Sequence, residues 1–143
     1  MKIFNIKNLL TIYKMINQTV ANWHNLVKNR DSAGLDTLLA DNVVFHSPIL
    51  HSPQIGKEIT KMYLSAALMI FNDTFKYVRE VVNGQDIVLE FQVVIDNIIV
   101  NGVDIFTCDE NGQILDFKVM LRPLKAVYLV QQKMMAMLES MKF

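Results

Sequence analysis

The chain has 143 residues, of which 52% are hydrophobic, and this is enough for one domain with a core of its own. Basic and acidic side chains both number 14, so the net charge is zero and the sequence predicts neither nucleic acid nor a membrane as a partner. A single cysteine excludes an internal disulfide, and three histidines without a Cys/His cluster give no metal-ligand spacing, so we expect no metal or other cofactor and a reducing, cytoplasmic location.

Residues 1–18 are expected to form an N-terminal extension or an extra helix. Ile3, Ile6, Leu10 and Tyr13 are weakly amphipathic at helical spacing. Asn and Lys residues interrupt any signal-peptide core, and no small-residue cleavage site follows. Met15 is an alternative start, which leaves open whether residues 1–14 belong to the native protein. A single domain is expected over residues 19–143.

Helical elements are predicted to come first in this domain. Apolar residues at helical spacing predict helices over residues 19–28 and 55–70, and the Asp-Ser pair at 31–32 offers an N-cap for a short helix that ends at Leu39. A short strand over 43–46 lies between them. Two prolines in the loop that follows it exclude regular helix there.

Four strands are predicted next, over residues 74–82, 87–95, 98–108 and 113–122. The turn signals between them, listed in chain order, are Asn83-Gly84, Asp96-Asn97 and Asn111-Gly112. Such turns predict an antiparallel meander.

Pro123 is expected at the first position of a final helix with an apolar stripe, formed by Val127, Val130, Met134, Met137 and Met141. Helices followed by an antiparallel sheet are typical of an α+β domain. We therefore predict a cone-shaped, curved antiparallel sheet, an α+β barrel, with helices packed on its concave face.

Asp104 is the one charged side chain expected on the apolar face of this sheet. Odd-numbered residues from Ile87 to Ile95 are all apolar, which indicates a strand with one buried face. A two-residue turn at 96–97 would pair Leu89 with Asp104 and Phe91 with Gly102, leaving space beside the glycine. Because an ionised and unpaired carboxylate is costly to bury, Asp104 should be protonated, hydrogen-bonded or facing a cavity.

Several segments resemble the nuclear transport factor 2-like superfamily, particularly its SnoaL-like and ketosteroid isomerase-like branches. The sequence segments are Ala40-Asp41-Asn42-Val43-Val44-Phe45-His46-Ser47-Pro48, Gly102-Val103-Asp104-Ile105-Phe106 and Asp109-Glu110-Asn111-Gly112-Gln113-Ile114. The predicted helix after Gly56 lies between the first two. The resemblance covers roughly residues 19–125. It implies a cone with a pocket, in a superfamily of isomerases, cyclases, dehydratases, hydrolases and non-catalytic binding modules.

The resemblance also implies roles for single positions. Asp104 matches the protonated aspartate with which steroid isomerases of this superfamily donate a hydrogen bond. Trp23 stands where those enzymes have a tyrosine donor, and Ser47 where they have the carboxylate base. Val119 stands at the catalytic carboxylate of the SnoaL-like cyclases. The known proton-transfer mechanisms of both groups therefore do not carry over.

A different candidate site combines Asp104 with His46 as catalytic residues, because a histidine beside a carboxylate can move protons near neutral pH. The alternative is that the two form a structural hydrogen bond. The residues expected to bind a ligand are Trp23, Tyr63, Leu89, Phe91, Phe106, Phe117, Val119 and His51.

Three functions stay open on this evidence. The first is a module that binds a small hydrophobic or carbonyl-bearing molecule without turnover. The second is an isomerase, cyclase or hydratase that uses Asp104 and His46. The third is an assembly domain whose cone is filled by Phe91, Phe106, Phe117 and Met62. Loss of both known base positions favours the first.

The opposite sheet face is expected to carry a mixed but largely apolar surface, with Val88, Val94, Ile99, Val103, Ile105 and Met120 on it. Such a patch is large for a surface left in water. We expect a homodimer through this outer face, as the resemblance implies. The alternative is that the final helix covers part of it.

Overall fold

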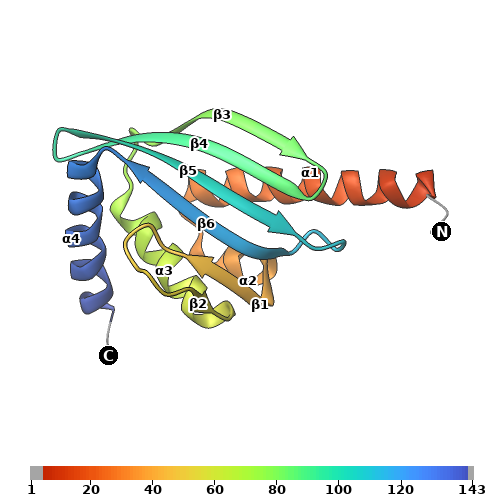
Figure 1. The fold of residues 1–143 in the computed structure, drawn as a ribbon, viewed down its shortest axis with the longest axis horizontal. Coiled ribbons are helices and arrows are strands. Elements are labelled where there is room, and N and C mark those ends of the chain that lie inside the picture. Colours follow the sequence, from red (N-terminus) through yellow and green to blue (C-terminus); the bar gives the residue numbers. More distant parts are fainter. Residues whose placement is uncertain (1–4, 142–143) are drawn as a thin grey trace.

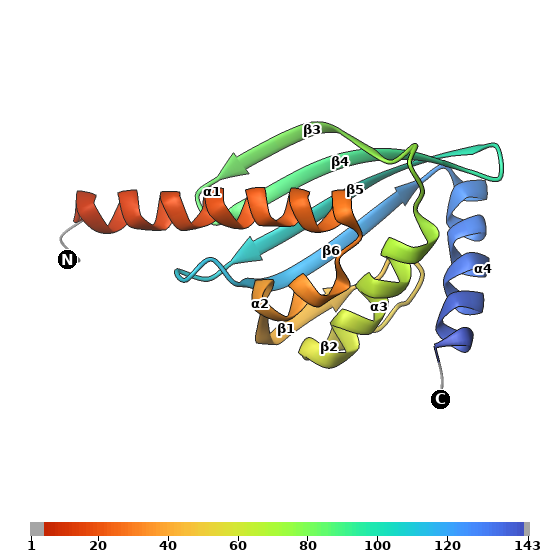
Figure 2. The same ribbon diagram turned by 180° about the vertical axis from the view of Figure 1, so that it is seen from behind.

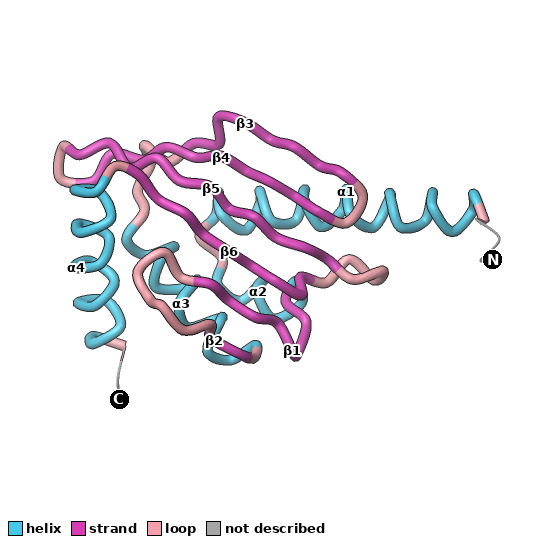
Figure 3. The backbone as a smooth tube through the Cα atoms, viewed as in Figure 1, coloured by secondary structure: helices cyan, strands magenta, loops and turns pink. Residues whose placement is uncertain are grey.

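The structure of the protein is a computed structural model that describes residues 5–141. Its helices are α1 (Ile6–Asn29), a 3-10 turn (Ser32–Gly34), α2 (Leu35–Leu38), α3 (Lys57–Ile70) and α4 (Leu124–Ser140). Its strands are β1 (Leu39–His46), β2 (Gln54–Ile55), β3 (Lys76–Asn83), β4 (Asp86–Ile95), β5 (Ile98–Cys108) and β6 (Ile114–Arg122) (Figure 3). Within residues 5–141, no helix is long and apolar enough to cross a membrane.

The strands form one curved sheet in the order β2-β1-β6-β5-β4-β3 (Figure 1). Strands β3 to β6 are the predicted antiparallel meander. Strand β1 pairs with β6 in parallel, so the sheet is mixed rather than wholly antiparallel, and it does not close into a barrel. The α+β cone is confirmed. Local turn signals could not reveal the parallel pair, because its strands are far apart in the chain.

The hairpin between β4 and β5 has the predicted register. Asp96 and Asn97 both have positive φ, as a two-residue turn of this kind requires. Leu89 lies opposite Asp104 and Phe91 opposite Gly102. The predicted space beside Gly102 is filled, because a Cβ atom there would lie 2.3 Å from Cζ of Phe91.

Helices α1 and α3 cover one face of the sheet, which we call the inner face, and no helix within residues 5–141 covers the other face (Figures 1 and 2). Alternating residues of β4 and β5 point inward and are buried, as the period of two predicts, and Phe117 of β6 is buried among them. On α4, Ala126, Val130 and Met134 pack in one cluster with Phe91 and other inner-face residues. The alternative in which this helix covers the outer face is therefore wrong.

Helix α1 is longer than the predicted helix at 19–28. Ile16 is already buried in the core, and Oγ1 of Thr19 donates a hydrogen bond of 2.6 Å to the carbonyl oxygen of Gly112 in the turn before β6. The core therefore begins before residue 19. The first turns of α1 extend past the sheet (Figures 1 and 2), and residues 1–4, which include Ile3, lie outside the described residues.

The segment between α1 and β1 is less helical than predicted. Asp31 makes no side-chain capping bond, and the helix expected over 32–39 is a 3-10 turn followed by the single turn of α2. Strand β1 starts at Leu39 rather than 43, because this residue takes an extended backbone and pairs with Ile114 of β6. Tertiary pairing thus overrides a weak local helix signal.

Candidate functional site

The candidate site centres on Asp104, in the middle of β5. The ladder places it between Leu89 of β4 and Val119 of β6, on the inner face. Only 6% of its surface is exposed. A carboxyl group in this position cannot be stabilised by bulk water, so its protein partners decide its state.

A chain of three side chains ends on this carboxyl group. Nε1 of Trp23 donates a hydrogen bond of 2.8 Å to Oη of Tyr77, and Oη of Tyr77 donates one of 2.8 Å to Oδ2 of Asp104. The indole N–H is a donor only, so the tyrosine oxygen must accept from it and use its own proton on Asp104. Oδ2 is thereby an acceptor.

The other carboxyl oxygen, Oδ1, has no hydrogen-bond partner within residues 5–141. Every fully buried side-chain oxygen or nitrogen in that range does have a partner, so Oδ1 itself is not fully buried. Oδ1 therefore contacts open space. When Asp104 is protonated, its proton belongs on this oxygen, since Oδ2 already accepts from Tyr77.

Burial raises the pKa of Asp104 from 3.8 to about 7, and the hydrogen bond from Tyr77 opposes this only in part. Burial, and then the charge of Asp104, raise the pKa of Tyr77 well above its usual value. The phenol is therefore a permanent donor, whereas the carboxyl group changes its protonation state near neutral pH.

The open space beside Asp104 is a cavity of about 60 Å³. Its walls come from α1, α3, α4, the loop after β1 and the sheet. Of the predicted site residues, those that line it are Trp23, Tyr63, Phe91, Asp104, Phe117 and Val119. The predicted site residues Phe106 and Leu89 do not line the cavity, because both are wholly buried in the core. The ring of Phe106 stacks on that of Phe117, with 5.3 Å between the ring centroids. The cavity also shows that the cone is not completely filled, and Met62, expected among its filling residues, is 39% exposed.

The two predicted histidines lie elsewhere. Nε2 of His46 is 2.9 Å from Oδ2 of Asp116, a residue of the outer face, and the neighbouring Phe45 points inward instead. This follows from alternation along β1, where Phe45 pairs with the inner-face residue Phe117 of β6. The expected pair of His46 with Asp104 is therefore wrong. His51 is exposed in the loop before β2 and does not line the cavity.

The sequence prediction missed Tyr77, the direct partner of Asp104. One signal was available in the sequence: Tyr77 lies on the predicted strand over 74–82, which is followed directly by the strand that carries Phe91. In the structure Tyr77 pairs with Phe91. The ladder between β3 and β4 shifts register between Tyr77 and Arg79, so simple alternation along β3 does not show which residues point inward. Phe71 and Phe75 also line the cavity and were missed; Phe75 was expected on the strand over 74–82, but β3 begins at Lys76 and both rings lie in the segment between α3 and β3.

Comparison with known proteins agrees with this architecture. The model of the SnoaL-like domain matches residues 20–117, and the chain belongs to this family. A structure described as an NTF2-like protein of unknown function from Mesorhizobium loti, 16% identical with a TM-score of 0.68, has the same fold. No curated protein matches the chain.

Two similar solved structures share about a third of their residues with it. A protein described as a steroid delta-isomerase, from Pseudomonas aeruginosa, is 35% identical, with 88% of this chain and 93% of that chain covered and a TM-score of 0.84. An uncharacterised protein with a cystatin-like fold from Silicibacter pomeroyi DSS-3 is 32% identical, with 82% and 83% covered and a TM-score of 0.77.

A more distant structure is that of SalBIII, described as an epoxide hydrolase/cyclase-like enzyme in pyran ring formation. It is 15% identical, covers 77% of this chain and 92% of its own, and has a TM-score of 0.64. At this identity the likeness shows the fold alone.

Proposed function

We propose that the protein binds a small hydrophobic molecule that carries a carbonyl group, and that Asp104 recognises this group. The observation that carries the proposal is the free oxygen Oδ1, which faces an otherwise largely apolar cavity. A neutral carboxylic acid in such surroundings is a strong hydrogen-bond donor to a carbonyl oxygen.

The hydrogen-bond chain supports this role because it orients the donor. Trp23 and Tyr77 hold Oδ2 from one side, so the carboxyl group cannot rotate freely and its proton stays directed into the cavity. A group fixed before the ligand arrives loses little conformational freedom on binding.

Binding without turnover is favoured because the cavity lacks a second proton carrier. Ser47 lines it, but its Oγ accepts a hydrogen bond of 3.2 Å from the backbone of Ile49 and has no basic partner. Besides Asp104, the titratable residues of the lining are Tyr63 and Tyr77. The phenol of Tyr77, whose pKa is raised by burial, is a poor base near neutrality.

Proton transfer on the same ligand is a second candidate function. It is favoured by the similar structure described as a steroid delta-isomerase and by the pKa of about 7 for Asp104, since a group with this pKa can both accept and return a proton near neutral pH. Deuterium uptake next to the carbonyl of a bound ketone in D₂O, measured by NMR, separates the two functions. Turnover requires faster uptake with the wild type than with Asp104→Asn, whereas a binding module leaves uptake at the rate of buffer.

Affinity for methyl ketones of six to ten carbons tests the proposal. Trp23 is the single tryptophan and lines the cavity, so its fluorescence reports binding. We expect the wild type to bind at pH 6 and to lose about tenfold or more of its affinity at pH 9, because ionised Asp104 donates no hydrogen bond.

Two variants and one control complete the test. Asp104→Asn should bind at both pH values, because its amide N–H₂ remains a donor, and Asp104→Leu should bind weakly at both. The control is Asp116→Asn, a change of the same kind on the outer face, which should behave as the wild type. Wild-type affinity in Asp104→Leu would show that Asp104 has no polar role in recognition.

We also propose that two copies associate through the outer sheet face. Ile99, Met120 and Val94 are 60%, 53% and 39% exposed there, and the other apolar residues of this face, Val88, Val103 and Ile105, are half-buried. In the described part of the chain, no helix covers this side of the sheet (Figure 1). The proposal of a cytoplasmic location rests on the absence of any cysteine other than the buried Cys108.

A further inference from the structure

A second, larger hollow lies next to the Asp104 cavity, between the end of α1, the loop after α3 and the start of β3. We call it the outer hollow. Its volume is about 580 Å³, compared with about 60 Å³ for the cavity. The side chains that line both spaces, and so form a common wall, are Val27, Leu68, Phe71, Phe75 and Tyr77.

The rest of the outer hollow is basic. Its remaining lining includes His24, Lys28, Arg30 and Lys76, against one carboxylate, that of Asp73. Arg30 is paired with Asp73 at 2.7 Å, and His24 with the nearby Glu80 at 2.6 Å. Lys28 and Lys76 make no ion pair with any residue from 5 to 141. Two unpaired positive charges are thus available to a ligand.

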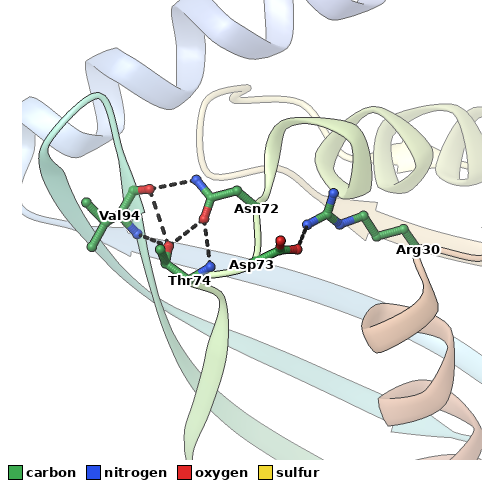
Figure 4. A network of polar contacts seen from close by, with 5 residues as sticks. All are labelled: Arg30, Asn72, Asp73, Thr74 and Val94. Atoms are coloured by element: carbon green, nitrogen blue, oxygen red, sulfur yellow. Dashed lines mark hydrogen bonds and ion pairs between the residues drawn. The ribbon is translucent and has the colours of Figure 1, made fainter.

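The backbone beside the common wall is held in place, as Figure 4 shows. Nδ2 of Asn72 donates to the carbonyl oxygen of Val94 at 2.7 Å, and the backbone N–H of Val94 donates to Oγ1 of Thr74 at 2.8 Å. The ion pair of Arg30 with Asp73 ties the same loop to the end of α1. The loop is therefore a fixed frame for the wall.

The wall itself consists of side chains. Phe71 and Phe75 are half-buried, and the ring of Phe75 lies 5.0 Å from those of Tyr77 and Phe91. Side-chain rotation is far easier than rearrangement of an anchored backbone. A ligand chain passing between the two spaces needs only such rotations.

The Asp104 cavity is too small to hold a whole ligand, so the ligand must extend beyond it. Sites for small organic ligands typically have several hundred Å³, whereas about 60 Å³ accepts only a few non-hydrogen atoms. The cavity thus has room for the carbonyl end of a ligand, and the adjoining outer hollow has room for the remainder.

We propose that the ligand is amphipathic, with its carbonyl group at Asp104, an apolar middle along Phe71 and Phe75, and a carboxylate end at Lys28 and Lys76. This inference rests on the proposed function, because the carbonyl end occupies the same site. The ligand class is that of hydrophobic oxo acids.

Matched pairs of probes test the inference separately from the proposed function. The oxo acids of eight, ten and twelve carbons with a methyl ketone at one end and a carboxylate at the other are compared with the methyl ketones of equal length. At low ionic strength we expect at least one acid to bind about fivefold tighter than its ketone, which is the effect that two exposed ion pairs give. The difference should shrink in about 0.5 M NaCl, because salt at this concentration screens exposed charges.

Two double variants locate the effect. Lys28→Gln/Lys76→Gln should abolish the preference for the acid and leave ketone affinity unchanged. The control Lys14→Gln/Lys125→Gln removes the same charge from exposed positions outside the outer hollow and should keep the preference. Ketone binding without any preference for the acids, or equal loss in both double variants, would overturn the inference and leave the proposed function standing. Failure of acids and ketones alike would overturn both.

Discussion

Replacing Asp104 by asparagine should change how the stability of the protein depends on pH. The pKa of Asp104 rises from 3.8 to about 7 on folding, so between these pH values the folded protein holds a proton that the unfolded chain has lost. The stability linked to this proton is complete below pH 4 and is lost as the pH rises to 7. The rise of the pKa from 3.8 to about 7 corresponds to about 4 kcal/mol of folding free energy in total, and about 3 kcal/mol of this is lost between pH 5 and pH 8.

Urea unfolding of the wild type and Asp104→Asn at pH 5 to 8, at one fixed protein concentration, measures this difference. Asparagine does not titrate and its N–H₂ and C=O groups can occupy the two carboxyl positions. Its free energy of unfolding should therefore gain about 3 kcal/mol relative to the wild type across this range. Other titrating groups cancel in the comparison. The control Asp116→Asn should show no comparable change. Parallel pH profiles for wild type and Asp104→Asn would refute the reasoning.

Three further substitutions test other parts of the structure. Gly102→Ala should destabilise the fold by about 1–3 kcal/mol and weaken ketone binding, because the new Cβ displaces the ring of Phe91 that lines the cavity; thermal unfolding and fluorescence titration check this. Ile105→Glu places a charge on the outer sheet face, so light scattering should show the wild type at twice 16.4 kDa and this variant at 16.4 kDa, and a monomeric wild type would reject the dimer. His46→Gln should leave ketone affinity unchanged within about twofold and lower the free energy of unfolding by less than about 1 kcal/mol, because the partner of His46, Asp116, is a half-exposed residue on the outer face. A large loss of affinity would show that His46 takes part in ligand binding.

The sequence was most informative where local patterns decide the structure. Alternation along β4 and the two-residue turn after it place Asp104 opposite Leu89, and this pairing was predicted correctly because both strands belong to one hairpin. His46 was predicted beside Asp104, but which face of β1 points inward depends on the parallel pair of β1 with β6. That pair is not local, so the histidine was assigned to the wrong side.

The hydrogen-bond partner of Asp104 could not be predicted from such local patterns. Tyr77 reaches the carboxyl group from the edge strand β3, just before a shift in register, and Trp23 reaches Tyr77 from α1. Trp23 was predicted at the site as a ligand-binding residue, but its hydrogen bond to a tyrosine 54 positions away follows only from the packing of the helix on the sheet. Period and turn patterns carry no information on such a contact.

The protonation state of Asp104 is the most direct test of the proposed site. With aspartate carboxyl groups labelled with ¹³C, the signal that Asp104→Asn removes can be followed by NMR from pH 4 to pH 9. Our account predicts a titration near pH 7 that moves to higher pH when a methyl ketone is bound, because the ketone accepts a hydrogen bond only from the protonated acid. A titration near the ordinary value of 3.8, or one that a bound ketone leaves unchanged, would contradict it.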